Sequence, residues 1–369
     1  MHQNHQVKPS DPFTFSRTGI TVKNRSVLAA MTNKQSHENG ILSDSEINWL
    51  VRRAKGGFGI ITTAATHVSK DGQAWDGEFG VFDDMHVDKL TKLAKLTHGH
   101  DALIFAQLFH GGSQASQRLT GAVPLSSSRV RSKGSNNGFA REASNKEIER
   151  IIDDFTSAAV RCSNAGFDGV ELHGAHGYLI SQFLGSKTNT RSDKWGGNLE
   201  KRSRFLVEIY NSIKNNVPDS FLVGIRISPE LKSLGIDLED SLKLGQSLSD
   251  LGIDYLHISC WDAFKRSQTY PDDPKTLTEW FSECKDTLAP IISTGKVWST
   301  KDAQALMLQG ADLIGVARVG IGHPDWPKGM YDLNYDPQIP PFTTAQLEEA
   351  QLGAKFIDYM RNWEGFVVD

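Results

Sequence analysis

The sequence predicts a (β/α)8 TIM barrel, an α/β fold, and two features of the chain point to it. Short apolar runs alternate with amphipathic helical patterns, and the alternation repeats about eight times along the chain. Such repetition is compatible with a closed barrel or with an open doubly wound sheet. No dinucleotide fingerprint follows the first strand, and polar residues follow several different strands, as barrel active sites require. We therefore expect the barrel.

The predicted strands are nearly continuous apolar runs, without a strict alternation of apolar and polar positions. Runs of this kind are typical of parallel strands that are buried on both faces. They are Val27–Met31, Gly59–Ala64, Leu103–Leu108, Gly169–His173, Leu222–Ile227, Tyr255–Ser259, Ile291–Thr294 and Leu313–Ala317.

Helical patterns lie between the strands, and three of them begin at a capping signal. Ser144–Glu147 is a capping box that opens a long stretch with apolar residues at helical spacing. Ser43–Glu46 has the same pattern, and Ser299–Asp302 opens a shorter helix that ends near Gly310. Further helices are expected at Val87–His98, Leu199–Asn215, Leu238–Leu251, Leu277–Leu288 and Thr344–Met360.

We expect one domain over residues 1–369, with an insertion after the third strand. The insertion, residues 111–143, is rich in Ser, Gly, Arg and Asn and has no helical period. Loops of this length are usually functional or mobile, so we expect it to cap the mouth of the barrel. A disordered surface excursion is the alternative. Residues 344–369 form a C-terminal helix and tail.

Composition excludes several classes of function. The net charge of −4 is spread along the chain and provides no basic surface for nucleic acid or an anionic membrane. No apolar stretch is long enough to cross a bilayer, and no apolar core follows Met1–Gln6 as in a secretory signal. We expect a cytoplasmic protein whose partner is a small molecule; whether it forms a homo-oligomer is left open. The three cysteines are too far apart for a disulfide framework or an iron–sulfur cluster.

Two histidines and a tyrosine follow the fourth predicted strand. His173 and His176 are three residues apart, and a strand end that turns at Gly174 and Gly177 brings both to one side. Two neutral imidazoles can donate N–H groups to one carbonyl oxygen, and Tyr178 can supply a proton nearby. Taken alone, the pair is also compatible with core histidines bonded to backbone, or with a metal site.

The next segment, Gln182–Phe205, resembles the signature of the old yellow enzyme family. There, a histidine pair and G-Y-L precede an F-L…N-x-R-x-D-x-x-G-G…R-x-R-F segment, and this chain has both in that order. The resemblance extends from about Pro12 to Lys328 and implies an FMN-dependent barrel reductase that takes hydride from NADH or NADPH. We interpret Arg191, Asp193 and the turn at Gly196 as a structural brace without a chemical role.

The resemblance also implies contacts to FMN. Ala30, Met31 and Thr32 correspond to the family's first flavin contact, which is usually P-M-T or P-M-C, so that Ala30 replaces a proline. Ala65 matches a small residue that lets the backbone approach the ring, and Gln107 matches the amide contact to the flavin pyrimidine edge.

Arg226 matches the arginine beside flavin N1. A fixed cation favours the reduced flavin, because reduction places negative charge at N1 and O2. A barrel-wall ion pair is the alternative; it requires a partner, and none is near Arg226 in sequence.

The last two strands predict a phosphate site, since barrels often bind phosphate at a short helix start between strands seven and eight. Gly295 and Lys296 would provide backbone amides, and Arg318 a bidentate guanidinium. Ala317 stands where the family usually has Gly and would narrow this pocket.

The activity implied is reduction of an electron-poor alkene, such as an α,β-unsaturated carbonyl compound, by ping-pong hydride transfer. His173 and His176 would hold the acceptor oxygen, Tyr178 would protonate the α-carbon, and Phe109 would line the substrate pocket. One alternative is a metal-dependent barrel lyase or hydrolase with His173 and His176 as ligands, although no third ligand is apparent and we expect no metal. Another is a non-catalytic flavin-binding protein, which would not require a proton donor.

Three further residues have open roles. Lys34 follows the first flavin contact, where it would favour an anionic acceptor or be solvated. Position alone suggests that Arg361 and Trp363 reach the site of a neighbouring subunit. No residue decides between NADH and NADPH.

Overall fold

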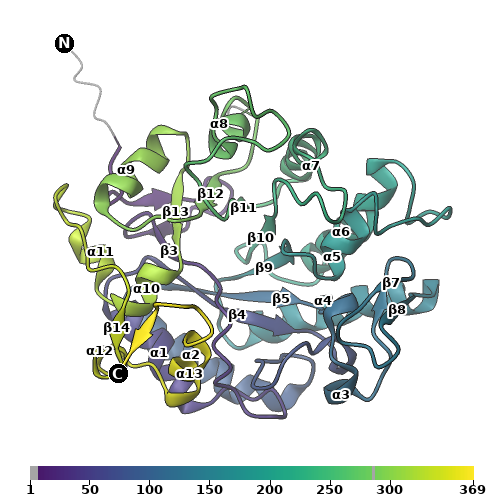
Figure 1. Ribbon diagram of the computed structural model, residues 1–369, viewed down its shortest axis with the longest axis horizontal. Helices are drawn as coiled ribbons and strands as arrows, with labels where there is room; N and C mark the ends of the chain where they lie inside the picture. Colours follow the sequence, from purple (N-terminus) through teal and green to yellow (C-terminus); the bar gives the residue numbers. More distant parts are fainter. Residues whose placement is uncertain (1–6, 285–286) are drawn as a thin grey trace.

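Eight parallel strands close into a barrel in the computed structural model, which describes residues 7–284 and 287–369 (Figure 1). The order around the barrel is β10-β11-β12-β13-β3-β4-β5-β9, so strands that follow one another in the chain are neighbours. The predicted (β/α)8 barrel is confirmed. The strands are β3 (Ser26–Leu28), β4 (Ile60–His67), β5 (Leu103–Phe109), β9 (Gly169–Gly174), β10 (Leu222–Ile227), β11 (Tyr255–Ser259), β12 (Ile291–Thr294) and β13 (Leu313–Val316).

Five strands end differently from the prediction: β5 and β9 are each one residue longer, and the differences at β3, β13 and β4 shape the mouth of the barrel. β3 ends at Leu28, before the predicted Met31, and β13 ends at Val316, before Ala317. At both ends the chain leaves the sheet to form the cavity described below. β4 continues to His67, past a register shift between Thr62 and Ala65. Shifts of this kind re-aim side chains at barrel rims.

Helices surround the barrel between the strands (Figure 1). Ser144 and Ser299 form the predicted capping boxes. Ser43 also caps its helix, but the Glu46 carboxylate does not return to it; it is buried and accepts hydrogen bonds from Asn33 and Ser36, in the loop after β3. The helices are α1 (Asp44–Lys55), α2 (Val87–His98), α4 (Asn145–Asn164), α5 (Leu179–Leu184), α6 (Leu199–Lys214), α7 (Leu238–Asp250), α8 (Leu277–Ser282), α9 (Thr300–Leu308), α10 (Arg318–Gly322) and α11 (Trp326–Gly329).

Two predicted helices were too long. α8 ends at Ser282, and residues 285 and 286 of its predicted extent lie outside the described residues. The predicted Thr344–Met360 helix is two helices, α12 (Thr344–Glu349) and α13 (Ala354–Met360). The break occurs because Gln351 adopts a left-handed backbone with φ 64°, and the Gly353 amide donates to Gln35 instead of continuing the helix.

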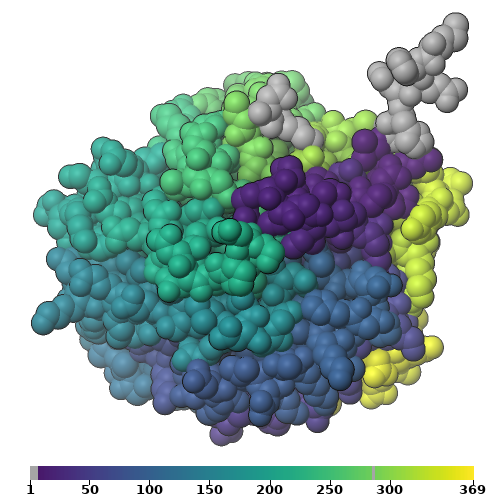
Figure 2. Space-filling view, turned by 180° about the vertical axis from the view of Figure 1, so that it is seen from behind, coloured from purple at the N-terminus to yellow at the C-terminus, as the bar shows by residue number. Residues whose placement is uncertain are grey.

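The N-terminal segment closes the bottom of the barrel. Its hairpin, β1 (Phe13–Thr14) and β2 (Thr21–Val22), presents Phe15 and Val22 to an interior cluster at the N-terminal ends of the strands. Figure 2 shows this segment in purple across the face that Figure 1 hides. Ligands can therefore approach the barrel interior from the opposite, C-terminal end of the strands.

The insertion carries regular elements and packs beside α5. It contains α3 (Gln117–Thr120) and a small sheet of β6 (Leu125–Ser126), β8 (Phe139–Glu142) and β7 (Val130–Arg131). Ser126 donates to Gln182 of α5 over 2.8 Å, and Gln114 donates to the backbone carbonyls of His176 and Gly177. The insertion thus borders the histidine turn. That it caps the mouth stays a prediction.

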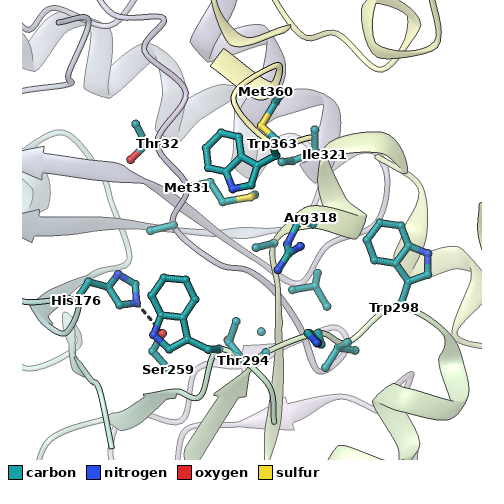
Figure 3. Close-up of a pocket in the computed structure, with 18 of the residues that line it drawn as sticks. Met31, Thr32, His176, Ser259, Thr294, Trp298, Arg318, Ile321, Met360 and Trp363 are labelled. Atoms are coloured by element: carbon teal, nitrogen blue, oxygen red, sulfur yellow. Dashed lines mark hydrogen bonds between the residues drawn. The ribbon is translucent and has the colours of Figure 1, made fainter. Parts of the chain in front are cut away.

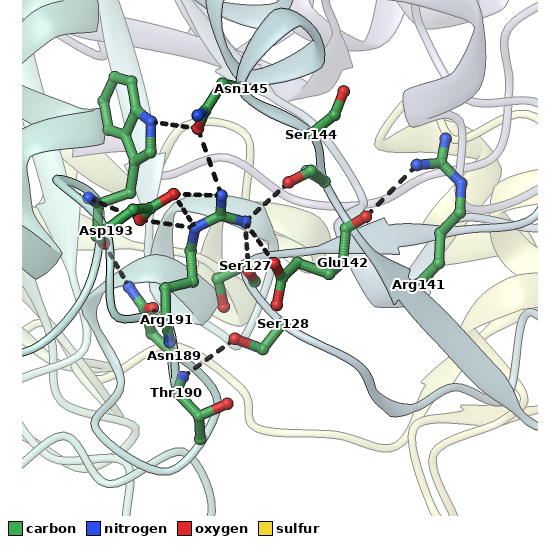
Figure 4. Close-up of polar contacts among 12 residues, drawn as sticks. Ser127, Ser128, Arg141, Glu142, Ser144, Asn145, Asn189, Thr190, Arg191 and Asp193 are labelled. Carbon is green, nitrogen blue, oxygen red and sulfur yellow. Dashed lines mark hydrogen bonds and ion pairs between the residues drawn. The ribbon is translucent and has the colours of Figure 1, made fainter.

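Arg191 fastens this insertion to the chain after α5 (Figure 4). Its guanidinium forms a 2.6 Å ion pair with Asp193 and donates to the carbonyls of Ser127 (3.0 Å) and Ala143 (2.7 Å). Asn145, at the start of α4, accepts from the same group. The arginine has the structural contacts that the sequence predicted for it, none of which is to a cavity residue.

His86 offers a test of how burial couples stability to pH. Its side chain is 1% exposed, and neither ring nitrogen has a hydrogen-bond partner among the described residues. Burial lowers the pKa of His86 to about 4. Between about pH 4 and 6.5 the unfolded chain therefore binds more protons, so this histidine makes stability fall as the pH falls through that window.

We expect His86→Leu to raise the free energy of unfolding by about 1–3 kcal/mol at pH 7, because it removes two unsatisfied polar atoms. It should also reduce the loss of stability between pH 7 and pH 5. Urea denaturation of both proteins at the two pH values measures this. A variant that loses as much stability on acidification as the parent would contradict the assignment.

Candidate active site

A cavity of about 560 Å³ opens at the C-terminal ends of the barrel strands (Figure 3). A second cavity of about 50 Å³ adjoins it, and Ala30, Thr32, His176 and Arg226 line both. The structure thus gathers nearly all the predicted site residues around one continuous site. The larger cavity also has Met31, Gly295, Lys296, Ala317 and Arg318 in its lining, and the smaller one has Ala65, Gln107, His173 and Tyr178.

The two histidines lie together, as the turn after β9 predicted. Their ring centroids are 5.0 Å apart, with ring planes nearly perpendicular. His176 has φ 62° and Gly177 has φ 80°, and these left-handed residues bring the second ring back beside the first. Both rings are neutral at physiological pH: burial lowers the pKa of His173 well below its usual value and that of His176 to about 3.

Hydrogen bonds fix the proton of His173 and engage His176. The Ala175 amide donates to Nδ1 of His173 over 3.4 Å, which places the proton of the neutral ring on Nε2. Nε2 of His176 lies 2.8 Å from the Ser259 hydroxyl, which also accepts from Arg226 over 3.0 Å. The Nε2–H group of His173 is therefore free to donate to the oxygen of an acceptor. His176 can donate to that oxygen either through Nδ1 or through Nε2, if the oxygen takes the place of the Ser259 hydroxyl.

Tyr178 lies beside the histidine pair and packs against several aromatic rings. Its ring centroid is 5.1 Å from that of His173 and 6.1 Å from that of Trp75. Burial raises the pKa of the Tyr178 hydroxyl above its usual value, so the group keeps its proton at physiological pH. Trp75 was not identified from the sequence, where nothing distinguishes it from other loop aromatics.

Phe109, the predicted substrate contact, lines neither cavity. It is fully buried and packs edge-on against Tyr178 with centroids 4.9 Å apart. Because Phe109 lies on β5 behind that ring, its position suits support of Tyr178 and not contact with substrate. This corrects the expectation for Phe109.

Arg226 is the charged group at the junction of the two cavities. It is 5% exposed, and its Nε has no partner among the described residues. Its nearest counter-charge is Glu171 on β9, which the sequence had not connected with it. Because Arg226 lines both cavities, its buried guanidinium fits a ligand that carries an oxygen or nitrogen acceptor.

Beneath the cavities, four side chains form a hydrogen-bonded row. Gln107 donates to Glu171 over 2.7 Å, and the other Glu171 oxygen lies 2.7 Å from Nδ1 of His257. Nε2 of His257 lies 2.6 Å from the Thr294 hydroxyl. Glu171 and His257 were missed, although a carboxylate and a histidine inside otherwise apolar strands are a signal that could have found them.

The end of the large cavity at β12 and β13 provides donors for an anion. Gly295 and Lys296 have positive φ values of 155° and 55°, and both residues line the cavity. The Lys296 ammonium lies 3.3 Å from Asp262, so its side chain has a partner outside the cavity. Arg318 points into the cavity (Figure 3), and no described residue pairs with its guanidinium. This charge and the backbone amides of Gly295 and Lys296 fit a phosphate.

The opposite wall of the large cavity is formed by the C-terminal helix α13 and the turn that follows it. Tyr359, Met360 and Trp363 line the large cavity, and Figure 3 shows the Trp363 indole above Met31. Trp363 thus lines its own chain's site. That it reaches the site of a neighbouring subunit stays a prediction. Arg361 points elsewhere and pairs with Asp369 over 2.6 Å. Lys34 lies over the Tyr359 ring, 5.0 Å from its centroid, and lines neither cavity.

The described residues include no cluster of three or more His, Cys, Asp or Glu side chains that could hold a metal ion. His173 and His176 therefore have no third ligand there, and the metal alternative has no geometric support. No helix within residues 7–284 and 287–369 has the length and apolar character needed to cross a membrane.

Comparison with known proteins agrees with this site. The family model described as NADH:flavin oxidoreductase / NADH oxidase matches residues 11–333. The probable NADH-dependent flavin oxidoreductase YqiG of Bacillus subtilis is 36% identical over 331 residues, which cover 88% of each chain. NADH:acrylate oxidoreductase of Vibrio harveyi is 32% identical over 84% of this chain, which spans only 32% of that protein.

A solved structure, the old yellow enzyme homologue from Zymomonas mobilis, has a TM-score of 0.79 at 28% identity and covers 90% of this chain and 94% of its own. The family match includes all eight barrel strands and the loops directly after them, and it ends before the wall formed by Tyr359, Met360 and Trp363. The chain therefore belongs to the NADH:flavin oxidoreductase family, that of old yellow enzyme, whose members bind FMN and take hydride from NADH or NADPH.

Proposed function

We propose that this flavin oxidoreductase reduces activated C=C bonds, those of α,β-unsaturated carbonyl compounds and related electrophiles, in a ping-pong cycle. The observation that carries the proposal is the neutral histidine pair beside a protonated tyrosine at one side of the cofactor cavity. An N–H donor for an oxygen and an O–H donor for a carbon are the two groups that such a reduction requires of the protein.

FMN would lie across the two cavities. Arg226 would face the N1 and O2 side of the flavin, Gln107 its pyrimidine edge, and Thr32 its O4 side. Ala30, Met31 and Ala65 would allow the ring to pack closely, and the amides at Gly295, Lys296 and Ala317 with the Arg318 guanidinium would hold the phosphate. The chemistry that bound FMN supplies is hydride transfer, taken from NADH or NADPH and given to the acceptor.

The chain's own residues would bind and polarise the acceptor. His173 would donate Nε2–H to the acceptor oxygen, and His176 would stabilise the negative charge that develops there as hydride arrives at the β-carbon. Tyr178 would give its proton to the α-carbon. Neutral rings suit this role, since they bind an uncharged carbonyl group without a counter-ion. The acrylate that one relative's name specifies is itself an electron-poor alkene.

The first experiment is anaerobic. We reduce the holoenzyme with one equivalent of NADPH, then of NADH, add 2-cyclohexenone and follow the flavin absorbance. Rapid return of the oxidised spectrum is the expected result, because the enone accepts hydride in the second half of the cycle. Flavin that stays reduced in the presence of the enone would contradict enone reduction and leave another acceptor to be sought.

The histidine pair is tested by the double variant His173→Ala with His176→Ala. We expect FMN to stay bound and enone reduction to slow by at least about 100-fold, since one good oxyanion donor supplies about 3 kcal/mol. Stopped-flow reoxidation measures the rate. His37→Ala, at an exposed histidine, is the control and should react like the parent. Near-parental reoxidation of the double variant would remove the histidines from the proposed mechanism.

The phosphate site is tested by comparing Arg318→Ala with Lys296→Ala. We expect Arg318→Ala to raise the Kd for FMN at least about tenfold, because it removes a charge-assisted bidentate contact. Lys296→Ala should change it by less than about twofold, since the ammonium forms an exposed ion pair with Asp262. Fluorescence titration of the apoprotein measures both. Equal losses would show that the Lys296 side chain also reaches the phosphate.

A further inference from the structure

The buried row Gln107–Glu171–His257–Thr294 connects two residues that line the cavities through two that do not. Glu171 is 1% exposed and His257 is fully buried. They lie on β9 and β11, on either side of β10. The β10 residue opposite Glu171 is Gly224, where a Cβ would lie 2.0 Å from an atom of the Tyr255 ring. The space that the missing side chain leaves at Gly224 is therefore occupied by the Tyr255 ring.

The charge state of the row is fixed by its surroundings. Burial raises the pKa of Glu171, but His257, Arg226 and Gln107 outweigh it and hold that pKa below its usual value. Burial lowers the pKa of His257. The Gln107 amide that donates to Glu171, together with the Arg226 charge nearby, fits a carboxylate at Glu171 paired with a buried neutral imidazole at His257.

An ionised carboxylate can only accept hydrogen bonds, and this sets the sense of every other bond in the row. Gln107 must turn its NH2 group toward Glu171, which leaves Oε1 for the cavity. His257 must carry its proton on Nδ1, so Nε2 accepts from the Thr294 hydroxyl. Thr294 then presents only oxygen lone pairs to the cavity.

We propose that Glu171 is a positioning residue that makes the floor of the cofactor site a row of hydrogen-bond acceptors, so that the site selects the donor-bearing edge of its ligand. The inference rests on the proposed placement of FMN. It assigns Gln107 Oε1 as the acceptor for flavin N3–H, and Thr294 as an acceptor for a ribityl hydroxyl. A ligand without donors at these points would leave buried acceptors unpaired, which is costly.

The test exchanges the amide and the carboxylate that form the hydrogen bond between residues 107 and 171. Gln107→Glu alone places two carboxylates in contact, and Glu171→Gln alone removes the group that orients Gln107. Each is expected to raise the Kd for FMN at least tenfold, measured by fluorescence titration of the apoprotein. The double variant keeps one carboxylate and one amide, with an oxygen of residue 107 again facing the cavity. Its Kd should return to within about threefold of the parent.

The flavin potential separates positioning from a merely structural role. In the double variant the carboxylate itself faces the flavin, where it opposes the negative charge of the reduced state. The equilibrium constant for two-electron reduction should therefore fall at least tenfold, or about 30 mV. Loss of a structural brace would change the thermal unfolding temperature but not this potential.

Glu78→Gln is the matched control. Glu78 is also a buried carboxylate beside a histidine, with an Oε1 to His67 Nδ1 distance of 2.9 Å, but it lines neither cavity. Its Kd for FMN and its potential should stay near those of the parent. Circular dichroism establishes that each variant is folded.

Three results would overturn the inference: a Glu171→Gln variant that binds FMN like the parent, a double variant no better than the worse single variant, or a double variant with the parental potential. If the single variants fail to fold, the double variant still decides, because it is expected to fold and bind FMN. Failure of the parent protein to bind FMN would instead refute the proposed placement of FMN itself.

Discussion

Closure of the parallel barrel is the constraint on which the rest of the structure depends. Because all eight strands run in one direction, their C-terminal ends meet at one rim, and side chains distant in sequence become neighbours there. Thr32, Arg226 and Arg318 are joined in one site for this reason alone. The hairpin that carries Phe15 seals the other end, so the interior is open only where these polar groups gather.

A barrel closed in this way places charge in a poorly solvated interior, and the structure compensates for it locally. Arg226 and Glu171 are both buried, and each would be costly without the other. The histidines nearby respond by staying neutral instead of adding charge. The result is one cation and one anion beneath a set of neutral donors and acceptors.

The sequence predicted the barrel from local patterns, and it predicted most of the site residues from the resemblance to a family. Apolar runs located every barrel strand to within a few residues, and the turn after β9 accounted for the histidine pair. Contacts between distant segments could not be predicted in this way. Glu171 on β9 meets His257 on β11 across the intervening strand β10, and Trp363 lines the cavity from beyond the break at Gln351 between α12 and α13. The prediction for Phe109 was wrong for a similar reason: Phe109 ends β5, one residue beyond the predicted strand, and the Tyr178 ring packs against it.

The two sides of the site differ in how they are built, and this difference bears on substrate choice. The proposed cofactor contacts lie on strands or directly after them, where the sheet fixes the backbone. The outer wall consists of Trp261, which is 71% exposed, and of Trp363 and Tyr359 at the C-terminal helix. Aromatic side chains held on loops and a short helix can change without disturbing the barrel. Members of one family can therefore share hydride chemistry and differ in acceptor, and the residues that decide the acceptor are those that strand and helix periodicity does not reveal.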